Sequence, residues 1–155
     1  MHDLLSLRTP QQEDKVLFDR LAQLYAYDFR DITDLVIGRD GLFGSHSCFA
    51  EMWTDPDRHP YLIFVETEPA GFAIVQWTGK DYDMEQFFVM RKFRRTGLGR
   101  AAAYRLFDMF RGPWGIEQIA GNTVAQAFWR NVISGYTDDD FEDTLGDDPM
   151  QSFVS

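Results

Sequence analysis

The stretch RKFRRTGLGR, residues 91–100, combines two glycines with a group of basic side chains. Gly97 and Gly99 permit backbone conformations and close approaches that a β-carbon would exclude. The basic side chains nearest to them are Arg94, Arg95 and Arg100. An alanine-rich run follows, and where a helix begins its first amide groups lack carbonyl partners and carry the positive end of the helix dipole. The spacing therefore predicts an anion site, and a diphosphate suits it best.

The better-known phosphate-binding motifs do not fit this stretch. A dinucleotide fingerprint, GxGxxG, would need glycine at position 102, which is Ala102. A P-loop would need Gly-Lys followed by Ser or Thr, which is also missing. A tight turn with solubilising arginines is the simpler alternative, because a lone R-x-x-G-x-G pattern arises by chance.

The charge of the chain is unevenly distributed. The formal net charge is -10, yet residues 91–111 hold seven basic residues and a single acidic one, Asp108. From residue 131 to the end there are seven acidic residues and no basic one. Because an acidic surface repels nucleic acid, the basic block predicts a small local anion site and not a nucleic-acid interface. The acidic end is either a solvated, solubilising segment or a substrate-attracting one, and the sequence leaves both open.

The totals predict one domain, residues 1–155, in a reducing compartment. A single cysteine, Cys48, excludes an internal disulfide. The first residues lack a cationic start followed by an apolar core, and no apolar run is long enough for a bilayer. We therefore expect a cytoplasmic protein with no membrane partner. The histidines and Cys48 lack metal-ligand spacing, so no metal is expected.

Hydrophobic periodicity and turn residues predict alternating helices and strands. We expect strands over 4–8, 61–66, 71–77, 83–90, 115–121, 136–145 and 151–154, and helices from Thr9-Pro10 to about Phe29 and over 45–53, 97–111 and 123–133. The strand-helix-strand unit at 83–121 implies a parallel, right-handed crossover. The fold class expected is therefore α/β, with a mixed, mostly antiparallel sheet and helices on both faces.

Residues 85–99 resemble motif A of the GNAT superfamily of acyl-CoA-dependent N-acyltransferases. In that motif an acidic residue on a strand precedes an aliphatic strand end, and Arg-x-x-Gly-x-Gly/Ala then opens a helix. Arg94, Gly97 and Gly99 match the signature, and Val89 matches the strand end. The run Asn122, Ala125, Phe128 and Trp129 resembles the Asn-x-x-Ala-aromatic pattern of the next helix. The resemblance covers residues 61–136 well and implies a GNAT-like fold.

The resemblance implies acetyl-CoA as the cosubstrate. Its pyrophosphate would lie on the loop and helix start, next to the Arg94 side chain and the amides of Arg95, Thr96, Gly97, Leu98, Gly99 and Arg100. Phe88 and Val89 would give main-chain contacts to the pantetheine arm and the thioester, where neighbouring strands splay apart. Asn122 would reach the arm and Phe128 would pack against it. Core packing is the alternative role for Phe128 and Trp129.

Acyl transfer to an amine needs a proton acceptor, because only a neutral amine attacks a thioester. The resemblance implies Glu85 as this base, directly or through water. Strand alternation predicts that its side chain shares a sheet face with Phe87 and Val89, and a surface carboxylate is the alternative. Trp129 stands where the superfamily often has a tyrosine acid, and indole cannot protonate a thiolate. Tyr136, the nearest downstream phenol, is the substitute we consider.

The acceptor is expected to be a primary amine, attacked by direct transfer in a ternary complex. Segments that meet the acceptor in this fold carry aromatic and acidic side chains, which favour a cationic small molecule or basic peptide end: Tyr25, Tyr27, Asp28, Trp53, Asp138, Asp139, Asp140 and Glu142. Trp129 favours an alternative, a non-catalytic acyl-CoA-binding module that serves as sensor or partner subunit. The resemblance is also compatible with a homodimer.

Overall fold

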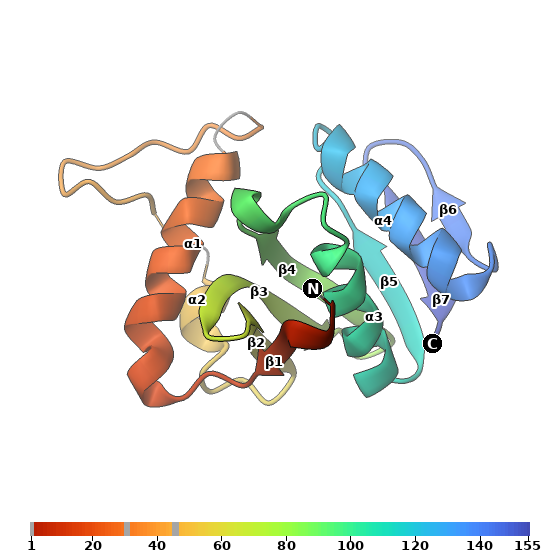
Figure 1. The fold of residues 1–155 in the computed structure, drawn as a ribbon. Helices are drawn as coiled ribbons and strands as arrows, with labels where there is room; N and C mark the ends of the chain where they lie inside the picture. The colour runs from red at the N-terminus through yellow and green to blue at the C-terminus, as the bar shows by residue number, and fades with distance from the viewer. Residues whose placement is uncertain (1, 30–31, 45–46) are drawn as a thin grey trace.

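A seven-stranded sheet forms the centre of the computed structural model, which describes residues 2–29, 32–44 and 47–155 (Figure 1). The strand order is β1-β2-β3-β4-β5-β7-β6. The strands are β1 (Leu5–Arg8), β2 (Arg58–Val65), β3 (Glu68–Trp77), β4 (Tyr82–Val89), β5 (Pro113–Glu117), β6 (Glu142–Thr144) and β7 (Met150–Val154). The α-helices are α1 (Lys15–Phe29), α2 (Cys48–Glu51), α3 (Leu98–Met109) and α4 (Thr123–Thr137). Short 3-10 turns lie at His2–Leu4, Gln12–Asp14 and Arg91–Phe93.

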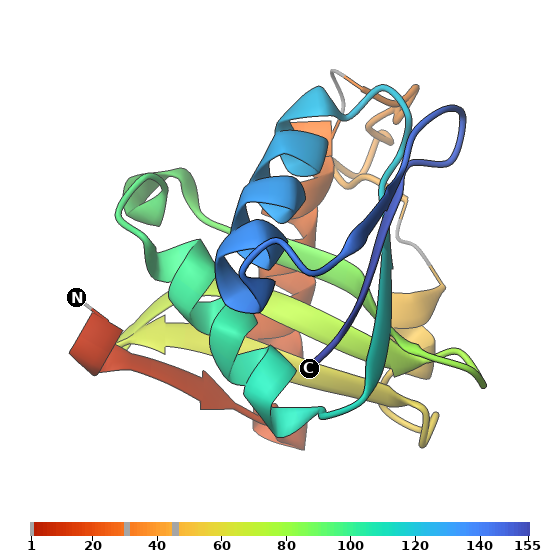
Figure 2. The ribbon, with the colours of Figure 1, turned by 90° about the vertical axis from the view of Figure 1, so that its right-hand side faces the viewer.

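The expected fold class is confirmed. Strands β4 and β5 pair in parallel, with α3 as the crossover, and the other neighbours pair antiparallel. Helices α1 and α2 cover one face, where Phe18 and Phe49 pack on Phe72 and Phe88 of the sheet. Helices α3 and α4 cover the other face, where their side chains pack around Trp114 (Figure 2).

Several expected boundaries differ from the structure. The first helix begins at Lys15, behind a 3-10 turn in which the amide of Gln11 donates to Asp14, and Thr9 does not cap it. The second helix is a single turn, Cys48–Glu51, and the expected Ser45 and His46 lie outside the described residues. The expected strand over 136–145 is wrong, because α4 continues to Thr137 and leaves only β6, Glu142–Thr144. The ring of Tyr136 packs on Phe107 and Phe153, which favours this longer helix.

Strands β4 and β5 separate toward their carboxyl ends. Tyr82 of β4 pairs with Trp114 of β5. Beyond this pair β4 continues to Val89 and β5 to Glu117. An unpaired gap in the middle of the sheet exposes main-chain groups that a ligand can reach. The divergence therefore positions a cleft between α1 on one side and α3 and α4 on the other.

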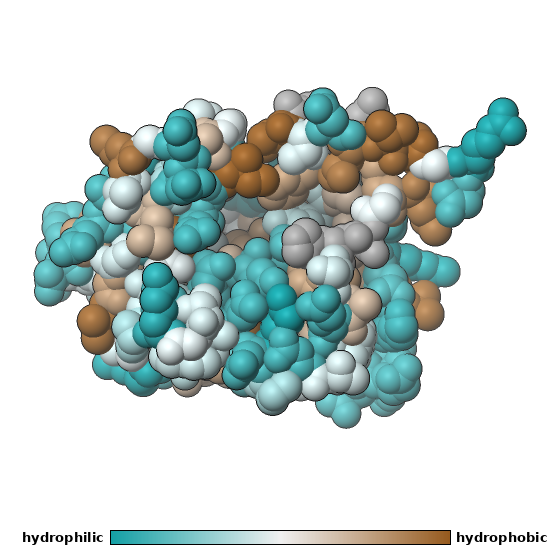
Figure 3. Space-filling view, turned by 180° about the vertical axis from the view of Figure 1, so that it is seen from behind, coloured by the Kyte–Doolittle hydropathy of each residue, from teal (hydrophilic) through white to brown (hydrophobic). Residues whose placement is uncertain are grey.

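Apolar side chains gather along one edge of the molecule. Hydrophilic residues cover much of the face in Figure 3, and its upper edge is apolar. Residues 32–44 and 119–124 lie at that end (Figure 1), and they include these exposed apolar side chains: Ile32, Val36, Ile37, Leu42, Ile119 and Val124. A β-carbon on Gly121 would lie 3.6 Å from Cγ2 of Ile32, so the two segments meet across the cleft. Within the described residues, no helix is long and apolar enough to cross a bilayer.

Candidate active site

Two adjoining cavities occupy the gap between the diverging strands. The first, of about 740 Å³, lies between the end of β4, residues 91–100 and α4, and we call it the arginine cavity. The second, of about 710 Å³, lies between α1, β4 and residues 117–119, and we call it the carboxylate cavity because Glu85 and Glu117 line it. Residues that line both form what we call the junction: Tyr25, Phe29, Phe87, Asn122, Ala125 and Trp129.

The loop before α3 has the backbone of an anion site. Arg95 has φ 58° and Gly97, which caps α3, has φ 83°, both left-handed. The buried Phe93 and a hydrogen bond from Thr96 Oγ1 to the Phe93 carbonyl, 2.6 Å, fix the loop. Within the described residues, the amides of Gly97, Gly99 and Arg100 have no acceptor. These donors at a helix start favour an anion.

Internal contacts hold two of the predicted arginines. Arg94 donates from Nε to the Val89 carbonyl, 2.7 Å, and forms an ion pair with Asp28 of α1. Arg100 donates to Asn131 of α4, 2.6 Å. Arg95 is exposed and has no ion pair among the described residues. All three arginines line the arginine cavity. Arg94 also holds the loop against the end of β4, through its hydrogen bond to the Val89 carbonyl.

An aromatic side chain lies close to the backbone at Gly99. A β-carbon there would lie 3.2 Å from two ring atoms of Phe128, which in turn stacks on Phe87 at 5.8 Å. Asn122 caps α4, because its Oδ1 accepts from the Ala125 amide at 3.0 Å. Phe128 and Asn122, two of the predicted site residues, both line the arginine cavity. Each also supports the fold, Phe128 by stacking on Phe87 and Asn122 by capping α4.

Three further predicted residues, Leu98, Phe88 and Val89, differ in how their groups are directed. Leu98 is fully buried and Phe88 packs toward α1, so neither side chain is free for a ligand. A β-carbon on Gly71 would lie 1.9 Å from the Phe88 carbonyl oxygen, which shows that this carbonyl is directed at β3. Val89, by contrast, faces the α3 side and lines the cavity.

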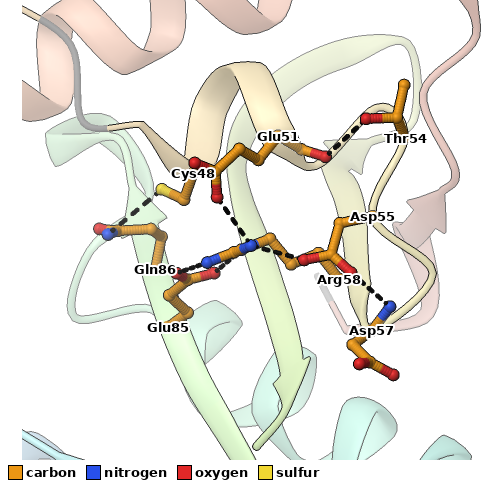
Figure 4. Close-up of polar contacts among 8 residues, drawn as sticks. All are labelled: Cys48, Glu51, Thr54, Asp55, Asp57, Arg58, Glu85 and Gln86. Atoms are coloured by element: carbon orange, nitrogen blue, oxygen red, sulfur yellow. Dashed lines mark hydrogen bonds and ion pairs between the residues drawn. The ribbon is translucent and has the colours of Figure 1, made fainter.

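A β-bulge places Glu85 on the face opposite to the one predicted. Gln86 pairs with Ile74 and Met84 with Val75, which leaves Glu85 between them without a partner. Glu85 and Gln86 therefore both face α2 (Figure 4). Phe87 and Val89 instead pack on the side of α3 and α4. The expectation that Glu85 shares a face with Phe87 and Val89 is wrong, because a bulge adds one residue to the alternation.

Arg58, which the sequence did not single out, holds Glu85 in place. Its Nε and Nη2 lie 2.9 Å and 3.0 Å from the two carboxylate oxygens, and its Nη1 contacts Glu51 and Asp55 (Figure 4). Both side chains of the Arg58–Glu85 pair are largely buried, at 14% and 13% exposed. One guanidinium thus contacts three carboxylates, those of Glu51, Asp55 and Glu85. Its single positive charge does not balance their negative charges, so the group as a whole is negative.

Asp83 is a further carboxylate near Glu85 and Glu117, and the sequence analysis did not name it. Its Oδ1 is buried and has no hydrogen-bond partner among the described residues. The pKa of Asp83 is raised to about 7, mainly by burial; the Glu117 backbone lowers it, and the charges of Glu117, Glu85 and Asp81 also contribute to the rise. Its charge neighbours place Asp83 beside the carboxylate cavity.

Tyr136 and the acidic end lie away from both cavities. The hydroxyl of Tyr136 donates to Asp108 at 2.8 Å and accepts from Arg111 at 3.1 Å, and burial raises its pKa. Asp138, Asp139 and Asp140 follow the end of α4 and are exposed. Neither Tyr136 nor these aspartates line the arginine or the carboxylate cavity.

The Acetyltransferase (GNAT) family model matches residues 19–132. The chain belongs to this family. The cosubstrate of such an acetyltransferase is acetyl-CoA. A sequence search of curated proteins found no match.

Solved structures similar to this GNAT acetyltransferase confirm the fold. An acetyltransferase from Thermus thermophilus has TM-score 0.73 and 18% identity, with 97% of each chain covered. The ribosomal-protein-S18-alanine N-acetyltransferase of Escherichia coli has TM-score 0.66 and 16% identity, covering 97% of this chain and 93% of that one. The spermidine N-acetyltransferase of Vibrio cholerae, in complex with CoA and spermine, has TM-score 0.66 and 11% identity, covering 98% and 96%.

The arginine cavity fits the cosubstrate of this GNAT acetyltransferase. It offers free helix-start amides and arginine side chains for a diphosphate, and an unpaired strand edge for an extended arm. Phe87, Phe128 and Val89 supply apolar walls. Asp28 is the carboxylate that lines this cavity among the described residues, and ion pairs with Arg91 and Arg94 neutralise it.

Proposed function

We propose that the chain is a single N-acetyltransferase domain that moves an acetyl group from acetyl-CoA to a primary amine. The observation that carries the proposal is the pair of cavities that meet at the junction. An anion-binding loop borders one cavity and carboxylates border the other, so each reactant has its own compartment. Direct attack in a ternary complex needs no more than this contact between compartments.

The arginine cavity holds the cosubstrate in this proposal. The amides of Gly97, Gly99 and Arg100 bind the diphosphate, and Arg95 adds a side-chain donor. The main chain of Val89 pairs with the pantetheine arm, and Phe128 packs against it. The bound molecule supplies an acetyl group activated as a thioester, which the junction presents to the carboxylate cavity.

Glu85 accepts the proton that the attacking amine must lose. Its carboxylate lines the carboxylate cavity, and Arg58 holds both oxygens in a fixed direction. Each of those oxygens can accept a further hydrogen bond, so Glu85 takes up the proton directly or through a water molecule. A neutral amine then attacks at the junction, where Trp129 and Phe87 exclude bulk water.

The acceptor in this proposal is a cationic amine. Glu85 and Glu117 line its cavity, Asp83 lies beside them, and Arg58 is shared among three carboxylates. An excess of negative charge in a partly closed site attracts a second ammonium group on the acceptor. The similarity to a spermidine N-acetyltransferase is in keeping with this class.

Release of free thiol from acetyl-CoA tests the proposal. The purified chain is incubated with acetyl-CoA and paired amines, such as 1,4-diaminobutane and butylamine. We expect turnover of the diamine with kcat/KM about ten times that of the monoamine, which corresponds to about 1.4 kcal/mol. Acetyl-CoA alone should raise the Tm, because a ligand that binds only the native state stabilises it.

Glu85→Gln separates the enzyme from the alternative, a module that binds acyl-CoA without turnover. Glu51 and Asp55 still neutralise Arg58 in this variant, so the fold is retained. We expect kcat/KM to fall about 100-fold while the Kd for acetyl-CoA is unchanged. Glu68→Gln, at an exposed ion pair with Lys92, is the matched control. Cofactor binding without thiol release across the whole amine panel would favour the binding module, which Trp129 at the expected acid position makes the competing candidate.

A further inference from the structure

Tyr25 lies at the junction, in the second half of α1. Its ring packs against Phe29 at 4.5 Å, Phe72 at 5.4 Å and Phe88 at 5.5 Å between centroids. Phe88 directly precedes Val89 at the end of β4, so the ring is fixed beside the strand end. Tyr25 also lines both the arginine and the carboxylate cavity. The phenol is therefore placed where the two reactants of the proposed reaction meet.

The hydroxyl of Tyr25 has no role in holding the described fold together. No hydrogen bond joins it to any part of the chain that the structure describes, whereas Asp108 and Arg111 both contact the hydroxyl of Tyr136. Phenylalanine could make the same ring contacts, so the hydroxyl of Tyr25 is available to a ligand in the cavities that this residue lines.

The surroundings of Tyr25 keep its proton in place. Burial, with a smaller effect of Cys48, raises the pKa of Tyr25 well above its ordinary value. The phenol therefore remains protonated at the pH of any assay and acts as a donor, not as a base. A short O–H···O⁻ hydrogen bond in a site that excludes water is among the strongest that a neutral side chain can make.

We propose that Tyr25 is a catalytic residue whose hydroxyl donates a hydrogen bond to the oxyanion formed during acetyl transfer. This inference rests on the proposed function. The amine nitrogen forms a bond to the thioester carbon, and the carbonyl π pair moves onto the oxygen. Tyr25 stabilises that oxygen and keeps its own proton. The pair then returns, the C–S bond breaks, and the leaving thiolate takes up the extra proton that the nitrogen still carries, while Glu85 holds the proton that the acceptor lost before the attack.

Tyr25→Phe removes only the hydroxyl, and two nucleophiles test its role. Thiol release from acetyl-CoA is followed with 1,4-diaminobutane and with hydroxylamine, which is largely uncharged at neutral pH and needs no base. We expect kcat to fall about 100-fold with both, as for the loss of one oxyanion donor. The Kd for acetyl-CoA and the Tm should not change. Glu85→Gln should slow only the diamine reaction, which separates the donor from the base.

Tyr27→Phe is the matched control: the sequence placed Tyr27 with the acceptor segments, but in the structure it is 56% exposed on the same helix and lines neither cavity. It should leave all these values unchanged. Wild-type rates in Tyr25→Phe would overturn the role of Tyr25 and leave the proposed function standing. A parallel loss of acetyl-CoA affinity would also overturn it, since that marks a packing role. Absence of thiol release from the wild type with either nucleophile would overturn both proposals.

Discussion

Asp83 and Glu85 are two positions apart on β4, and their neighbours give them different chemistry. Arg58 binds both oxygens of Glu85, while one oxygen of Asp83 is buried without a partner. The bulge at Glu85 turns both carboxylates toward the same side of the sheet as Glu117. The residue type alone therefore does not identify the proton acceptor, and the guanidinium decides which carboxylate is held in a fixed direction.

Asp83→Asn tests the effect of burial on this carboxyl. The native state retains a proton on Asp83 up to about pH 7, whereas the unfolded chain releases it near its ordinary pKa of 3.8. Stability from this group is therefore complete below that lower pKa and is lost as the pH rises toward 7. Since Asn does not titrate, the Tm of the variant minus that of the wild type should increase from pH 5 to pH 7 and then level off. Thermal unfolding at four pH values measures this.

The control for Asp83→Asn is Asp140→Asn, at an exposed carboxylate beyond α4. Its Tm difference from the wild type should vary little over the same pH range. A difference for Asp83→Asn that is also constant with pH would show that the carboxyl is not protonated in the native state.

At the scale of elements, the order from β4 through α3 and β5 to α4 was predictable. Each element has its own hydrophobic periodicity and is bounded by turn or capping residues close to it in the sequence. The RRTGLG loop, its left-handed Gly97 and the Asn122 cap belong to this class. The bulge at Glu85 was not predictable, because strand alternation does not mark where an extra residue enters. The Arg58–Glu85 pair was also missed, since it depends on the register of three strands across 27 residues of sequence.

Gly71→Ala tests whether the β3–β4 register supports the cleft. The new β-carbon would lie 1.9 Å from the Phe88 carbonyl oxygen and 3.1 Å from the Val89 Cα, and these backbone atoms cannot move without separating the strands. We expect the free energy of unfolding to fall by about 3 kcal/mol, which lowers the Tm by roughly 6–12 °C. Acetyl-CoA affinity should also fall, because Val89 lines the arginine cavity.

Gly44→Ala provides the comparison, since a β-carbon there meets nothing within 4 Å. Its Tm should stay close to that of the wild type in the same thermal scan. An equal Tm for both variants would mean that β3 and β4 accommodate the added carbon and that Gly71 is not required for this register.

At the scale of the whole molecule, basic side chains line one cavity and acidic side chains line the other. The composition revealed only part of this arrangement. The chain has net charge -10, and the basic block was expected to mark an anion site. The structure places four of its arginines, Arg91, Arg94, Arg95 and Arg100, around one cavity. The sequence left open whether the acidic end is solubilising or attracts the substrate; Asp138, Asp139 and Asp140 line neither cavity, and Glu85 and Glu117 border the carboxylate cavity instead. Long-range contacts between β4 and β5 create that wall, so sequence position could not show it.

The meeting of the two cavities predicts that acetyl transfer proceeds without an acetylated enzyme. The only cysteine, Cys48, is fully buried, and burial, aided by the charge of Glu85, raises its pKa to about 12. Its thiolate is therefore scarce at neutral pH, and a covalent intermediate has no suitable nucleophile there. Initial rates measured against both substrates should give intersecting double-reciprocal lines. Mass spectrometry after incubation with acetyl-CoA alone should show the unmodified chain, and Cys48→Ala should retain turnover. Parallel lines together with an acetyl group on Cys48 would instead require that the acetyl group leaves the junction before the amine arrives.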